Sequence, residues 1–66
     1  MYIVIELQKH ADGKLTNLVT VHATKEEAES KYHTILSFAA VSELPKHSAT
    51  ILNEDGSPVM YKHYRH

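Results

Sequence analysis

Two short segments of the 66-residue chain concentrate side chains that bind anions. The first is SELPKHS, residues 42–48, in which Lys46 offers an ammonium, His47 an imidazole and Ser48 a hydroxyl. The second is YKHYRH, residues 61–66, which interleaves two tyrosines with cationic side chains. Cationic donors hold phosphates, and aromatic rings stack on bases. Both segments are candidate ligand contacts, although a polar loop and a charge-guarded edge strand would have the same composition.

The middle of a predicted helix adds two further candidates. Tyr32 lies on the apolar stripe of that helix, so its ring is expected to pack while its hydroxyl stays at the rim. His33 lies well off the stripe, where it either lines a seam between subunits or is simply solvated. The complete set of predicted ligand-binding residues is Tyr32, His33, Lys46, His47, Ser48, Tyr61, His63, Tyr64 and Arg65.

Neither metal binding nor catalysis is predicted. The histidines lack the close spacing of metal ligands, and no cysteine accompanies them. No serine sits in a G-x-S-x-G turn, and the glutamates of residues 26–29 are explained by the start of a helix. We therefore expect a non-enzymatic protein without a cofactor, whose histidines lie at the surface. These histidines are His10, His22, His33, His47, His63 and His66.

The elements that must position these side chains are organised around a helix predicted for Thr24 to Val41. Thr24 and Glu27 have the spacing of a capping box, and the acidic first turn complements the helix dipole. One apolar stripe follows at helical spacing. Phe38 and Val41 point away from this stripe and therefore need a second neighbour. The stripe consists of Ala28, Tyr32, Ile35, Leu36 and Ala39.

Four β-type segments flank the helix. Alternating apolar residues predict strands over residues 2–8, 15–22, 46–53 and 59–65. One Asp-Gly pair lies between the first and second segments and another between the third and fourth, which favours two hairpins. The predicted fold is α+β: one domain over residues 1–66, in β-β-α-β-β order, with a four-stranded antiparallel sheet and one helix on one face.

One helix cannot cover both faces of such a sheet. We expect the uncovered face to carry Tyr2, Val4, Leu18, Leu52 and Met60. With Phe38 and Val41 also left over, self-association into a homodimer or higher oligomer is the predicted completion of the fold.

Composition excludes several classes of protein. Seven Lys and Arg against eight Asp and Glu give a net charge of −1, which argues against a nucleic-acid binder. No apolar run approaches the roughly 20 residues of a membrane span, and the N-terminus reads as a strand rather than a signal peptide. The expected location is the cytoplasm.

Several stretches of the chain resemble a group of short, mostly uncharacterised proteins of Firmicutes and their prophages. These stretches cover nearly the whole length: Met1 to Gln8, Asp12 to Val19, Glu27 to His33, Ala39 to Ala49 and Tyr64 to His66. In size and style only, the chain is also similar to phage anti-defence proteins that hold nucleotide signals at subunit interfaces. The resemblance implies a phage or prophage context and a host-cell cytoplasmic location, without a mechanism.

These observations predict a phage-type homo-oligomer that sequesters a small anionic ligand, such as a nucleotide immune signal, at a subunit seam. The alternative is a protein-interaction module that inhibits or assists a host or phage protein through the surface around Phe38 and Val41 or the free sheet face. A nucleic-acid binder acting through the C-terminal strand, residues 59–65, ranks third, because the net charge opposes it.

Overall fold

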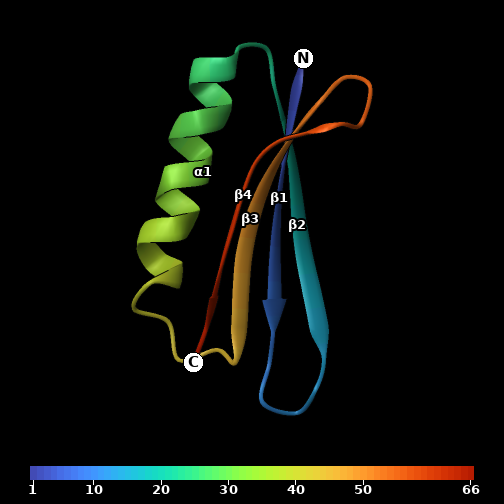
Figure 1. The fold of residues 1–66 in the computed structure, drawn as a ribbon. Coiled ribbons are helices and arrows are strands. Elements are labelled where there is room, and N and C mark those ends of the chain that lie inside the picture. Colours follow the sequence, from blue (N-terminus) through green and yellow to red (C-terminus); the bar gives the residue numbers. More distant parts are fainter.

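The computed structural model describes residues 1–66 as one antiparallel sheet with a single helix across one side (Figure 1). The strands are arranged in the order β2-β1-β3-β4. This confirms the predicted α+β fold, with β-β-α-β-β order and one helix on one face. The elements are β1 (Tyr2–Lys9), β2 (Leu15–His22), α1 (Lys25–Ala39), β3 (Lys46–Asn53) and β4 (Pro58–Arg65).

Each hairpin turns where the Asp-Gly pairs predict it. Gly13 and Gly56 have φ angles of 90° and 84°, a backbone region that an L side chain rarely enters. The Asp12 carboxylate accepts a 2.9 Å hydrogen bond from the Lys14 N–H in the first turn. In the second turn, the Asn53 side-chain oxygen accepts from the N–H groups of Asp55 and Ser57, each at 3.0 Å. Local turn chemistry therefore sets the β1–β2 and β3–β4 pairings.

The helix begins at its predicted cap and ends two residues before its predicted end. Thr24 has an extended backbone, and its hydroxyl accepts from the Glu27 N–H at 3.2 Å. Phe38, off the buried stripe in the last turn, is 66% exposed, and Val41, beyond the end of the helix, is 80% exposed. The helix is neither long enough nor apolar enough to cross a membrane.

The core lies between the helix and the two central strands. Ile51 of β3 and Val4 of β1 are its largest fully buried side chains, and each contributes about 1.5–3 kcal/mol through burial. Small residues let the backbones approach closely. Ala28 and Ala39 of the helix and Ala49 of β3 have no exposed surface. Tyr32 and Ile35 complete the buried helical stripe, as predicted.

The expected assignment of residues to the two sheet faces was wrong. Pairing of Val4 with Ile51, and of Ile51 with Met60, puts these residues under the helix. Strand alternation then places Tyr2 and Leu18 on that same side, whereas only Leu52 of the expected set lies on the bare side. The two faces of β1 are both apolar enough to be buried. The small and branched residues of β3 decide between them, because they accept the helix.

We call the side away from the helix the open face. It is formed by Ile3, Ile5, Leu7 and Lys9 of β1; Leu15, Asn17, Val19 and Val21 of β2; Lys46, Ser48, Thr50 and Leu52 of β3; and Tyr61, His63 and Arg65 of β4.

Shortening Ile51 to Val should lower the free energy of unfolding by about 1 kcal/mol, since it removes one methylene from a filled core. Urea denaturation monitored by circular dichroism measures this. The control, Val41→Ala, removes apolar atoms from a side chain that is 80% exposed and should change stability by less than about 0.5 kcal/mol. Equal effects of the two substitutions would contradict the assigned core.

Candidate functional site

Three cationic side chains lie side by side across the open face. Lys9 of β1 pairs with Lys46 of β3, and Lys46 pairs in turn with Arg65 of β4. Neighbouring strands are about 4.8 Å apart, so the three side chains leave the sheet as one row. We call Lys9, Lys46 and Arg65 the cationic row. Its members come from segments that are far apart in the sequence.

The cationic row borders a shallow cleft of about 190 Å³. Ser48 and His63 stand one row further along the open face, and Tyr61 stands behind them. Tyr61 is 60% exposed, and its ring stacks on that of His63 with the centroids 5.6 Å apart. The lining consists of Leu7, Lys9, Leu15, Lys46, Ser48, Tyr61, His63 and Arg65.

A hydrogen bond orients His63 within this cleft. The Tyr61 hydroxyl and His63 Nδ1 are 2.9 Å apart. When the hydroxyl donates this bond, the proton of the neutral imidazole resides on Nε2, which becomes a free donor. The cleft then presents cations, a hydroxyl and an imidazole N–H beside an aromatic ring.

No carboxylate from the strands balances the cationic row. The strand registers place neither Asp nor Glu on the open face. Like charges directly opposite one another destabilise a sheet. The row therefore carries a cost in stability that a bound anion would relieve.

A second group of predicted residues lies on the other side of the sheet. Tyr32, His33 and Tyr64 line a groove between α1 and β4, with a volume of about 470 Å³. The ring centroids of Tyr32 and His33 are 5.3 Å apart in an edge-on arrangement, and the Lys62 ammonium lies 5.3 Å from the Tyr64 ring centroid. Burial raises the pKa of Tyr32, and the nearby Lys62 works in the opposite direction. This groove offers one ammonium and is mainly aromatic and apolar.

His47 is not a surface residue, as had been expected of the histidines. It is 4% exposed beneath the helix, and its Nε2 lies 2.6 Å from Glu6 Oε2. Gln8 Nε2 donates to the same carboxylate oxygen at 3.0 Å. His47 Nδ1 is buried without a partner, which costs about 1–3 kcal/mol. His47 therefore has a structural environment, whereas Lys46 is exposed on the open face and Ser48, 8% exposed, lies low in the cleft there.

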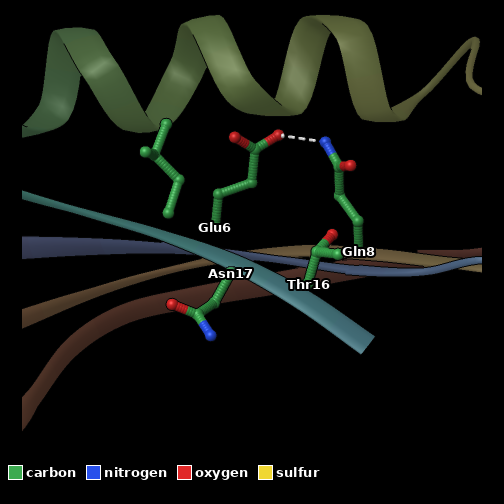
Figure 2. A pocket seen from close by; sticks show the side chains of 5 residues that line it. Glu6, Gln8, Thr16 and Asn17 are labelled. Atoms are coloured by element: carbon green, nitrogen blue, oxygen red, sulfur yellow. Dashed lines mark hydrogen bonds between the residues drawn. The ribbon is translucent and has the colours of Figure 1, made fainter. Parts of the chain in front are cut away.

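The Glu6 carboxylate is held in its charged form. Burial would raise its pKa, but hydrogen bonds from His47 and Gln8, together with the charges of His47 and Lys31, bring the pKa below its ordinary value of 4.5. Figure 2 shows Glu6 and Gln8 directed toward the helix, above a cleft of about 180 Å³ that Thr16, Asn17 and Leu18 complete. Asn17 belongs to the open face, and its side chain points away from Glu6 and Gln8 in Figure 2, so the cleft contains one carboxylate and one amide. No cation lines it.

The nine predicted ligand-binding residues thus form no single site. The open face brings together Lys46, Ser48, Tyr61, His63 and Arg65. Tyr32, His33 and Tyr64 meet in the groove beside the helix, and His47 is buried between the two layers. The reason is strand alternation, which sends successive residues of β3 and β4 to opposite faces.

Lys9 completes the cationic row and was missed. It ends the first strand, next to a turn, where a lysine is unremarkable by sequence. Only the register with Lys46 identifies it. No three His, Asp or Glu side chains come together in a way that could hold a metal ion.

Comparisons of the chain with protein-family models, curated proteins and solved structures found no match.

The Glu6–His47 contact predicts a specific pH dependence of stability. Because folding lowers the pKa of Glu6, its contribution is complete above about pH 4.5 and is lost as the pH falls through the lower, folded-state value. Glu6→Gln should cost about 1–3 kcal/mol at pH 7, and this difference from the wild type should shrink towards pH 3.

Urea titrations at a series of pH values measure this difference. Glu43→Gln, a change at an exposed carboxylate in a loop, is the matched control and should follow the wild-type curve. A Glu6→Gln curve parallel to that of the wild type from pH 7 to pH 3 would contradict the role assigned to the contact.

Proposed function

We propose that the protein binds a small anionic ligand at the cationic row and holds it without chemical change. The observation that carries this proposal is the alignment of Lys9, Lys46 and Arg65 in one register on a face that has no strand carboxylate. Arg and Lys donors provide charge-assisted hydrogen bonds to phosphate or carboxylate oxygens. Ser48 and the His63 ring add neutral donors beside the row.

The neighbouring residues favour an anion that also has a planar group. Tyr61 is exposed and stands two rows from the cations on the same face. With about 3.3 Å per residue, four residues along the strand separate the ring from the Arg65 position by about 13 Å. A nucleotide matches this arrangement, with its phosphates at the cationic row and its base towards Tyr61. A nucleotide signal is accordingly the ligand class that we propose.

The chemistry of the surroundings supports sequestration rather than catalysis. The one short carboxylate–imidazole contact, Glu6 to His47, lies under the helix. The adjacent hydroxyl, Ser48, faces the other way, so it cannot complete a nucleophile–base–acid arrangement with this pair. In such a protein, function rests on affinity and slow release.

The alternative, a module that docks a host or phage protein, is favoured by a different observation. Away from the cationic row, Ile3, Ile5, Val19, Val21 and Leu52 adjoin one another on the open face, and contiguous apolar surface of this kind marks interaction sites. This alternative would be favoured if the protein co-purified with a stoichiometric protein partner and bound no small anion.

Isothermal titration calorimetry at low salt against inorganic phosphate, pyrophosphate and linear and cyclic nucleotides tests the proposal. We expect saturable binding of at least one nucleotide and no binding of its unphosphorylated nucleoside. Lys46→Gln and Arg65→Gln should each weaken binding about tenfold or more, as the loss of a hydrogen bond to a charged group requires.

Lys62→Gln is the matched control. It removes the same charge from β4 but on the helix side of the sheet, and it should change the affinity less than twofold. The absence of binding across the panel, or an equal loss in Lys62→Gln, would overturn the proposal. Binding of RNA alone, with a steep salt dependence, would instead revive the nucleic-acid alternative.

A further inference from the structure

The end of the open face furthest from the cationic row carries several exposed apolar side chains. Two of its edge-strand members, Val19 and Val21, are 52% and 59% exposed, and Tyr61 is 60% exposed. Val19 and Val21 adjoin the half-buried Ile5 and Ile3 of β1, and Thr50 lies between Ile5 and Tyr61. We call this surface the apolar rows: Ile3, Ile5, Val19, Val21, Leu52 and Tyr61.

We propose that a second copy of the chain packs its own apolar rows against these, related by a two-fold axis that runs across the strands. This proposal goes beyond ligand binding and does not depend on it. It also identifies the contact differently from the sequence-based expectation, in which Phe38 and Val41 took part. Phe38 belongs to the last turn of α1, off its buried stripe, and Val41 follows the end of this helix, so neither belongs to the open face of the sheet.

The available area fits a dimer of this kind. A face four strands wide and eight residues long covers about 500 Å², from about 4.8 Å per strand and 3.3 Å per residue. Two copies that overlap along the whole face, with a cationic row at each end of the overlap, therefore bury about 1,000 Å², which is the lower limit for a specific interface. We expect a dimer that dissociates in the micromolar range rather than an obligate one.

The open face is also suited to packing against the open face of a second copy. The strands β1 and β3 are hydrogen-bonded on both sides within the sheet, so packing this face leaves no backbone group unpaired. Two such sheets pack face to face at about 10 Å, with the side chains of both inner faces interdigitating. Each chain thereby gains the second layer that its single helix cannot provide.

Charge determines the direction of the two-fold axis. An axis along the strands would place both copies of the cationic row opposite each other across the ~10 Å gap, with no strand carboxylate between them. An axis across the strands puts the two rows at opposite ends of the dimer. Each row then approaches the partner's β3–β4 turn, which carries Asp55 without an ion-pair partner of its own.

The shape of the molecule agrees with this orientation. In Figure 1 the β3–β4 turn leans away from the helix, toward the side on which the partner would lie. The apolar rows of the two copies overlap near Ile5 and Val19, and each cationic row remains at the margin of the interface. The partner covers Tyr61, so phosphate contacts at the cationic row are compatible with the dimer, whereas a base stacked on Tyr61 would compete with it.

Light scattering coupled to size-exclusion chromatography, from micromolar to millimolar concentration, tests the dimer without any ligand. The wild type should approach twice the 7.5 kDa chain mass as concentration rises. Val19→Lys and Val21→Lys should remain monomeric, with circular dichroism and melting temperature confirming that they fold.

The matched control is Leu18→Lys. Leu18 adjoins Val19 on β2 and is equally exposed, at 51%, but it lies on the helix side opposite Glu6. This variant should dimerise like the wild type. A wild type that stays monomeric at millimolar concentration, or a Leu18→Lys variant as monomeric as Val19→Lys, would overturn the proposal.

The axis is tested by a distance measurement between spin labels. The chain has no cysteine, so Lys14→Cys in the β1–β2 turn gives one label per copy. An axis across the strands separates the labels by about 40 Å, whereas an axis along them brings the labels within about 20 Å, on the strand and sheet spacings above. The short distance would overturn the proposed orientation.

These results separate the two proposals. Lys46→Gln and Arg65→Gln remove ligand contacts but leave the apolar rows intact, so both variants should still dimerise even though each loses one cation that faces the partner's β3–β4 turn. Anion binding by a protein that stays monomeric would overturn only the dimer, and dimerisation without anion binding would overturn only the ligand site.

Discussion

A single 15-residue helix must stabilise a four-stranded sheet, and this constraint governs the molecule. The helix approaches the sheet most closely at three alanines without exposed surface, which are Ala28 and Ala39 of α1 and Ala49 of β3. The contact is therefore tight but narrow, and it buries β1 and β3 while β2 remains largely exposed on the same side. The other side of the sheet receives no cover at all. Both the cationic row and the apolar rows exist because the chain has no second layer to place over them.

Strand alternation then divides the chemistry between two environments. His47 and Ser48 are neighbours in sequence, yet one pairs with a carboxylate beneath the helix and the other borders the cationic row. The same division separates Tyr64 from Arg65. Residues of one donor-rich segment therefore cannot act together. The residues that can act together, such as Lys9, Lys46 and Arg65, are brought into register by pairings between distant strands.

The elements could be predicted from sequence because their signals are local. The Thr24 cap, the helical stripe and the two Asp-Gly turns each depend on residues a few positions apart. Which face of the sheet is buried could not be predicted in the same way. In β1, Ile3, Ile5 and Leu7 of the open face are more apolar than Val4 and Glu6, which lie on the buried face. Val4 and Glu6 lie under the helix because they pair with Ile51 and Ala49 of β3, which are far away in the sequence. Likewise, the sequence predicts a solvent-exposed Glu6, because its partner His47 is identified only by the fold. The cationic row can be recognised only when the strand order is known.

The order β2-β1-β3-β4 leaves two outer edges of very different character. Along β4 the edge carries Lys62, His63 and Arg65, whose charge discourages the addition of another strand. Along β2 the residues are Leu, Thr, Asn and Val until the final histidine, so the unpaired backbone groups of that edge lack such protection. The first hairpin is thus the side on which strand addition meets the least repulsion. At high concentration, strand addition at this edge is therefore a route to self-association that differs from packing of the open faces.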